Sequence, residues 1–375
     1  MEKISNRERI LLLLNHKPPD RVPWFGDLDY WYSSAKIKGA LSRKYLGDGY
    51  FQLNRDLGVG FYLQGFNPFT QHNARSALRE NISFSKKTIG EQQIRTMRTP
   101  RGDLTEIQQY LPTSFSWGYV KHFVETAEDL PAFKYYLESL SFSPAYDEAV
   151  RRKSIIGDNG VVLVYAPRSP FMQMVTTYIG IVHLVYLLAD APDEMMEIFD
   201  IMERKYDLAA EITVDSPAEC IMIPENLSSE VVGTGYYRRY LRGYESKWIK
   251  RIKQAGKYSF IHMDGTLKGL LRHVAETGFD VIEAATPFPS GDMTMEEIAA
   301  EITGDTIIWG GLPGIVFTPN FGEEEFVTHV KSILQVMRRK PGYVLGVADQ
   351  VPPDGILERV GSIAALCDEF GRYPG

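Results

Sequence analysis

Side chains able to bind a metal or move a proton follow several short apolar runs of the sequence. His262 and Asp264 follow one run, Asp349 follows a second and Glu225 follows a third. Residues i and i+2 of a strand point to the same side, so His262 and Asp264 can share one cation. One imidazole and two or three carboxylates suit Zn²⁺. We predict a metal site from these four residues. The structural alternatives are a hydrogen-bonded histidine and an aspartate that caps a helix.

Other residues at predicted strand ends are candidates for substrate binding. Asn226 follows one run and Arg168 follows another, where it can hold an anion or pair with a surface carboxylate. Glu283 is expected as a buried hydrogen-bonding acid, and the alternative is a role as an acid–base catalyst. Four aromatic residues lie at or just past strand ends and can wall a pocket for a flat ligand or pack in the core: Trp24, Phe25, Trp31 and Trp309.

The elements that carry these residues alternate between two patterns. Apolar runs occur at 161–165, 220–223, 258–261, 281–283, 306–309 and 343–347, and helical patterns separate them, such as 191–214, 236–255, 267–277 and 323–339. Such runs are typical of strands buried on both faces of a parallel sheet. Six strand–helix units favour a closed (β/α)₈ barrel, in which chemistry occurs at the carboxyl ends of the strands. A first barrel strand is expected at 22–25.

The first third of the chain is less regular. Residues 82–110 alternate between apolar and polar side chains around a turn at 99–103, which predicts a β-hairpin excursion from the barrel. No linker or charge run divides the chain. We therefore predict one domain, residues 1–375.

Composition excludes several classes of function. The chain has 375 residues with 48 acidic and 41 basic side chains, a net charge of −7, which argues against nucleic-acid binding. Its two cysteines, Cys220 and Cys367, cannot form a disulfide scaffold or an all-thiolate metal site. The motifs of a P-loop, a dinucleotide-binding turn and a nucleophile elbow are absent. Without an apolar stretch of 18 residues or a signal-peptide pattern, we expect a cytoplasmic protein with no membrane contact.

Several short motifs together resemble the uroporphyrinogen decarboxylase superfamily over essentially the whole chain. They are Arg7-Glu-Arg9, Lys17-Pro-Pro-Asp-Arg-Val-Pro23, Thr99-Pro-Arg-Gly-Asp103, Ile261-His-Met-Asp-Gly265, Gly278-Phe-Asp-Val-Ile282, Gly342-Tyr-Val-Leu345 and Val351-Pro-Pro-Asp354. The resemblance implies a (β/α)₈ barrel. The decarboxylases handle substrate carboxylates with an Arg-Gln-Ala-Gly-Arg-Tyr segment after the first strand. Here that region reads Phe25-Gly-Asp-Leu-Asp-Tyr-Trp31 without an arginine, so we exclude porphyrinogen decarboxylation.

The other branch of the superfamily contains zinc methyltransferases that work with corrinoid proteins. Its thiol-methylating members hold zinc with His-x-Cys and a later Cys, and the resemblance places His262, Asp264 and Asp349 at these positions. Oxygen ligands leave a harder Lewis acid than thiolates, better matched to an ether oxygen. The leading hypothesis is a methyltransferase that moves a methyl group from a small O-methyl compound, such as an aryl methyl ether, to a partner corrinoid protein.

Two alternatives remain open at this point. One is a metal-free lyase or decarboxylase of the same superfamily, acting on a small or tetrapyrrole-like substrate with Asp264 and Glu283 as acid–base groups. The other is a barrel that binds a tetrapyrrole or a corrinoid carrier without catalysis. The oligomeric state is also open, and the resemblance makes a homodimer one of the alternatives.

Overall fold

The computed structural model describes residues 4–62, 65–73, 82–302, 304–340 and 342–373. Its elements divide into two compact units, which are described separately. The first unit comprises Met1–Phe66, Tyr146–Tyr165 and Ser216–Gly375, and the second comprises Asn67–Ala145 and Ala166–Asp215. This division does not test the prediction of one domain over residues 1–375, some of which lie outside the described ranges.

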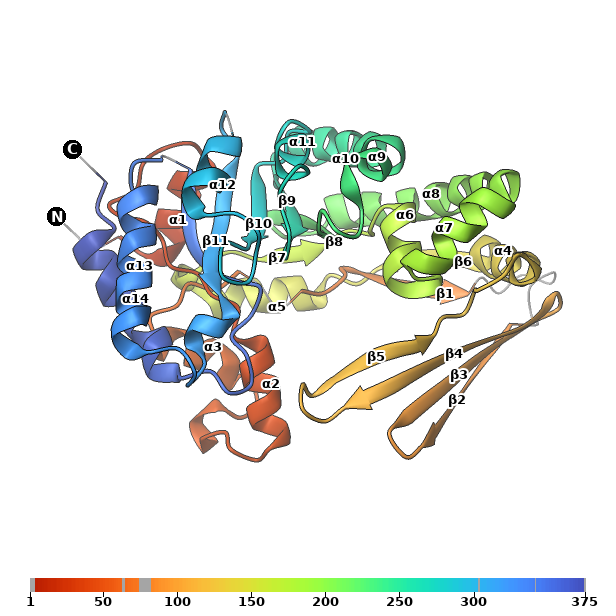
Figure 1. Ribbon diagram of the computed structural model, residues 1–375, viewed down its shortest axis with the longest axis horizontal. Helices are drawn as coiled ribbons and strands as arrows, with labels where there is room; N and C mark the ends of the chain where they lie inside the picture. Colours follow the sequence, from red (N-terminus) through yellow and green to blue (C-terminus); the bar gives the residue numbers. More distant parts are fainter. Residues whose placement is uncertain (1–3, 63–64, 74–81, 303, 341, 374–375) are drawn as a thin grey trace. The chain divides into compact units, whose positions relative to one another are not determined.

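A six-stranded parallel sheet is the basis of the first unit (Figure 1). Its strand order is β12-β11-β10-β9-β8-β7, so strands that are consecutive in sequence are neighbours in space, as βα units require. Each of the six apolar runs forms a strand. The strands are β7 (Leu163–Tyr165), β8 (Cys220–Leu227), β9 (Tyr258–Met263), β10 (Val281–Ala285), β11 (Ile307–Pro313) and β12 (Tyr343–Ala348).

Isolated parallel bridges continue this sheet from β12 towards β7. Trp24 bridges β12, and Phe25 bridges Gly60. Phe61 then bridges Gly160, three residues before β7 begins. Eight strand positions in this order are what a closed (β/α)₈ barrel requires. The continuous ladder among the described residues has six strands, so barrel closure stays a prediction that these bridges support.

Helices connect the strands of the first unit. They are α1 (Asn6–Leu14), α2 (Asp29–Ile37), α3 (Gly49–Asp56), α5 (Asp147–Ile156), α9 (Gly233–Tyr236), α10 (Arg242–Gln254), α11 (Leu271–Ala275), α12 (Met295–Glu301), α13 (Glu323–Met337) and α14 (Leu357–Phe370). The helix predicted at 236–255 is interrupted by a π-helical turn, η5 (Tyr237–Leu241). The helix predicted at 267–277 shortens to α11, because Gly269 has φ of +80°, outside the helical region. No helix in the described ranges is both long and apolar enough to cross a membrane.

The side chains inside the sheet form the main core of the first unit. Cys220 and Met222 of β8, Phe260 of β9 and Val281 of β10 all point into it. Strand side chains alternate between the two faces, so the next inward position on β9 after Phe260 is His262. The same alternation makes Glu283 the inward residue that follows Val281. The apolar core therefore turns polar at the carboxyl ends of the strands.

The second unit holds the antiparallel part of the chain. Strand β1 (Phe69–Asn73) pairs with β6 (Leu140–Pro144), and a four-stranded sheet contains β2 (Ser83–Ile89), β3 (Gln92–Thr99), β4 (Gly102–Leu111) and β5 (Ser116–Lys121). Its helices are α4 (Leu130–Ser139), α6 (Pro170–Gln173), α7 (Ile181–Asp190) and α8 (Pro192–Val214). The predicted hairpin is confirmed as β3 and β4, which pair across the expected turn. The excursion is larger than predicted, because a turn before β3 adds β2 and a turn after β4 adds β5.

Candidate metal centre

Three of the four predicted metal ligands lie together at the carboxyl ends of β9 and β12. They are His262, Asp264 and Asp349, and one ligand atom from each lies within 4.8 Å of the others. Nε2 of His262 is 4.0 Å from Oδ1 of Asp264 and 3.8 Å from Oδ1 of Asp349. The side chain of His262 is 12% exposed, against 29% for Asp264 and 44% for Asp349. The group is thus anchored in the core at the histidine and open to solvent at the carboxylates.

Curvature of the sheet brings Asp349 to His262. Strands β10 and β11 separate β9 from β12 in the sheet order. In a flat sheet three steps of about 4.8 Å would place the two strands about 14 Å apart. The 3.8 Å between the two side chains therefore requires a strongly curled sheet whose inward side chains converge. The same curvature is what a barrel needs.

Glu283 holds the other side of the His262 ring. In the parallel pairing of β9 and β10, Glu283 lies beside His262. Nδ1 of His262 is 2.6 Å from Oε2 of Glu283, and the Tyr62 hydroxyl donates a 2.7 Å hydrogen bond to Oε1. Glu283 is fully buried. Because a carboxylate only accepts hydrogen bonds, we assign the Nδ1 proton to this contact, which turns Nε2 towards the two aspartates. Glu283 is therefore a buried hydrogen-bonding acid, the first of its two predicted roles.

The charges around His262 favour a cation at the centre of the group. Burial lowers the pKa of His262, but the neighbouring carboxylates of Glu283, Asp349 and Asp264 outweigh it and raise the pKa to about 10. Burial, together with the charges of Glu283 and Asp264, raises the pKa of Asp349 to about 6 against the opposing effect of His262. Without a metal, Nε2 thus holds a proton, which a bound metal ion would displace.

Glu225, the fourth predicted ligand, does not join the group of three. It is fully buried, and its charge acts on Glu245 and Tyr237. The pairing of β8 with β9 explains this. It is irregular between Ile223 and Leu227, so Glu225 lies where the regular alternation of faces stops. Asn226 lies in this irregular stretch with φ of +59° and is exposed.

The predicted aromatic wall is mostly part of the core. Trp24, Phe25 and Trp309 are at most 1% exposed, and the rings of Phe25 and Trp309 are 5.2 Å apart. They therefore take the packing role, the other of their two predicted roles. Trp31 is partly buried, and its Nε1 donates to the backbone oxygen of Gly355. Arg168 belongs to the second unit, so its position relative to the metal centre stays a prediction.

Sequence reasoning missed Asp27, Tyr62 and Gln350. Asp27 is 1% exposed and accepts a 2.8 Å hydrogen bond from Nε2 of Gln350, the residue after Asp349. Burial, together with the charges of Asp349 and Asp29, raises the pKa of Asp27 to about 7, although the hydrogen bonds from the Asp29 backbone and the Gln350 side chain oppose this shift. A signal for Asp27 was present, because it follows the first predicted strand just as Asp349 follows the last.

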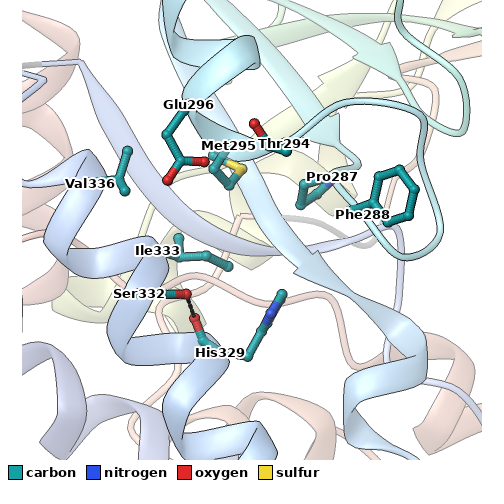
Figure 2. A pocket seen from close by; sticks show the side chains of 9 residues that line it. All are labelled: Pro287, Phe288, Thr294, Met295, Glu296, His329, Ser332, Ile333 and Val336. Atoms are coloured by element: carbon teal, nitrogen blue, oxygen red, sulfur yellow. Dashed lines mark hydrogen bonds between the residues drawn. The ribbon is translucent and has the colours of Figure 1, made fainter.

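A small pocket lies apart from this group. It has a volume of about 130 Å³ and lies between the loop after β10 and helices α12 and α13 (Figure 2). Figure 2 shows its lining: Pro287, Phe288, Thr294, Met295, Glu296, His329, Ser332, Ile333 and Val336. None of the predicted site residues lines this pocket, so it has no part in the metal centre.

Comparisons with known proteins identify the family of the chain and support its fold. Residues 143–370 match the family model described as uroporphyrinogen decarboxylase (URO-D). This match covers more than half of the chain, which therefore belongs to the URO-D family. Among solved structures, the chain is similar to a methyltransferase from Methanosarcina mazei, with a TM-score of 0.61 and 14% sequence identity over 98% of this chain and 99% of the other. At that identity the likeness shows a shared fold. No curated protein sequence matches the chain.

Proposed function

We propose that this chain is a zinc-dependent methyltransferase that takes a methyl group from an O-methyl compound and passes it to a partner corrinoid protein. The observation that carries the proposal is the convergence of His262, Asp264 and Asp349 at one point, with Glu283 behind the histidine. Membership of the URO-D family and the methyltransferase fold support it. We also propose that the sheet closes into a (β/α)₈ barrel.

The donor atoms fit a divalent metal. Nε2 of His262 and one oxygen from each aspartate would hold it, and Glu283 would supply the outer carboxylate that usually orients a metal-binding histidine. When bound, zinc supplies a Lewis acid that draws electron density from an ether oxygen. Nitrogen and oxygen ligands make it a harder acid than thiolate ligands would, which favours an ether over a thiol substrate.

The residues of this chain prepare the site for methyl transfer. Tyr62 holds Glu283, and Glu283 holds His262, so the imidazole keeps one orientation. The exposed sides of Asp264 and Asp349 face solvent, from which a substrate enters. We propose that Asn226 and Arg168 contact the substrate. In the transfer, the bond from the methyl carbon to oxygen breaks and its electron pair stays on oxygen, which takes up a proton. The cobalt(I) of the partner's corrinoid supplies the electron pair for the new bond.

The metal-free lyase is the weaker candidate. It needs Glu283 to exchange protons with a substrate, yet Glu283 is fully buried and both of its oxygens already accept hydrogen bonds, from Tyr62 and His262. A carboxylate held in this way orients its neighbours. The geometry therefore favours the metal-dependent reaction.

Metal analysis of the purified protein tests this proposal. We expect about one zinc per chain in the wild type, as for a single catalytic site. His262→Ala should lose the metal and the methyl transfer together. His183→Ala is the matched control, because His183 lies on α7 with a side chain that is 42% exposed. A protein without metal, or His262→Ala with wild-type activity, would contradict the proposal.

A further inference from the structure

Asp27 is a buried acid that the proposed reaction does not use. It comes two residues after Phe25, where the chain leaves its bridge to Gly60, and it is 1% exposed. A buried carboxyl group is costly unless hydrogen bonds compensate it. The partners of Asp27 therefore indicate why it is there.

Both carboxyl oxygens of Asp27 accept hydrogen bonds, and they do so from different segments. Oδ1 accepts from the backbone N–H of Asp29 at 2.8 Å and from the hydroxyl of Tyr50 at 3.4 Å. Oδ2 accepts from Nε2 of Gln350 at 2.8 Å. The backbone oxygen of Asp27 also accepts from the N–H of Val351 at 3.0 Å. Asp27 thus holds the segment 350–351 by hydrogen bonds to its side chain and to its backbone oxygen.

The segment 350–351 directly follows Asp349. The pairing of β11 with β12 ends at Ala348, so the sheet ladder stops one residue before Asp349. Asp349 is also the most exposed member of the group of three, with 44% of its side chain accessible. The sheet therefore places the residue before Asp349, and the contacts to Asp27 place the two residues after it.

We propose that Asp27 is a positioning residue of the metal centre, which clamps Gln350 and Val351 and so sets the direction of the Asp349 carboxylate. This inference rests on the proposed metal site. It adds that Asp27 acts on the metal site through the segment 350–351, which follows β12 and Asp349. Asp27 itself does not contact the metal. An aspartate is required because every partner of its two oxygens is a donor. An asparagine would turn an N–H towards one of these donors.

Zinc affinity measured by competition with a chromophoric chelator tests the clamp. The buffer is kept at about pH 8, where an acid with a pKa of about 7 is ionised. We expect Asp27→Asn and Gln350→Ala each to weaken zinc binding by about 10- to 100-fold, the usual effect of losing an outer partner of a ligand. Gln350→Ala leaves the carboxyl of Asp27 in place, so it tests the clamp even where Asp27→Asn disturbs folding. Gln52→Ala is the matched control, because it removes the same kind of side chain from an exposed position of α3 whose amide donates to Asp56 and not to Asp27.

The outcomes separate this inference from the proposed function. Wild-type zinc affinity in both Asp27→Asn and Gln350→Ala, with binding still abolished in His262→Ala, would overturn the clamp alone. Equal losses in Gln52→Ala and Gln350→Ala would also overturn it, because they would indicate an effect that does not depend on Asp27. A wild-type protein that binds no zinc would overturn the clamp and the metal site together.

Discussion

Nδ1 of His262 lies 2.6 Å from Oε2 of Glu283, in the buried layer directly below the candidate metal centre. This contact decides which nitrogen of the imidazole faces the two aspartates. A metal-binding histidine is usually held in this way by an outer carboxylate or carbonyl, which also makes it a stronger ligand. Glu283 is therefore as much a part of the centre as the residues that would touch the metal.

Glu283→Gln tests this relationship with almost no change of volume. The neutral amide accepts the Nδ1 proton less strongly than a carboxylate does, so we expect zinc affinity to fall by about 10- to 100-fold. Competition with a chelator measures the change. Glu230→Gln, at an exposed position of the same unit, should leave affinity unchanged. Equal affinities in Glu283→Gln and the wild type would refute the orienting role.

Tyr62→Phe removes the hydroxyl that donates to Glu283 and keeps the ring that packs 4.3 Å from Trp309. Because the buried carboxylate of Glu283 then loses one donor, the free energy of unfolding should fall by about 2 kcal/mol. Urea unfolding of the metal-free protein measures this loss. Tyr186→Phe, on a residue that is 64% exposed, should have no measurable effect. A Tyr62→Phe protein as stable as the wild type would show that the hydrogen bond contributes little.

The double variant Asp264→Cys with Asp349→Cys tests the importance of oxygen ligands. Thiolates are softer ligands, so we expect tighter binding of zinc and cadmium and a loss of activity on ethers. Cobalt(II) substitution provides the spectroscopic readout, because a thiolate–cobalt charge-transfer band should appear in the variant and be absent from the wild type. A variant that keeps full activity on ethers would contradict the link between ligand hardness and substrate.

A second buried acid, Glu245, should make stability depend on pH. The Tyr237 hydroxyl donates a 2.6 Å hydrogen bond to Oε2 of Glu245 and lies 2.7 Å from Oγ1 of Thr277. Burial and the charge of Glu225 raise the pKa of Glu245 well above its usual range, although the hydrogen bond from Tyr237 opposes this shift.

The sign of the pH effect follows from this raised pKa. The unfolded chain ionises Glu245 near pH 4, as for any glutamate, whereas the folded chain holds the proton to higher pH. Stability is therefore lost as pH rises above about 4.3, by at most about 1.4 kcal/mol per pH unit, until the folded pKa is passed. Glu245→Gln should remove this slope and be the more stable protein at neutral pH. Urea unfolding between acidic and neutral pH measures it, and parallel curves for the variant and the wild type would contradict the assignment.

Strand-end positions were the part of the site that the sequence predicted well. His262, Asp264 and Asp349 follow from one rule, that side chains at the carboxyl ends of parallel strands converge. The same rule predicts that Glu225 joins them, but an irregularity in β8 separates it from the group. Patterns of residue type do not reveal such an irregularity, because it depends on how two strands pair.

Partnerships between distant residues were beyond sequence reasoning. Tyr62 and Glu283 are 221 residues apart and meet only because their strand positions both face the interior. The excursion after β1 was underestimated for a similar reason, since β5 forms through pairing with β4 rather than through a strong alternating pattern of its own. Local periodicity predicted which segments are strands. The pairing of these strands in three dimensions determined which of their side chains come into contact.

Methyl transfer from a methoxylated aromatic compound to free or protein-bound cob(I)alamin is the most direct test of the metal-dependent reaction. The assay compares metal-free protein with the same protein after zinc is restored, and it follows the loss of the cobalt(I) absorbance under anaerobic conditions. We expect no transfer without metal, recovery with zinc, and no recovery in His262→Ala. Transfer at an equal rate by the metal-free protein, or none by the zinc-loaded protein across a panel of methoxylated aromatics, would contradict the proposal.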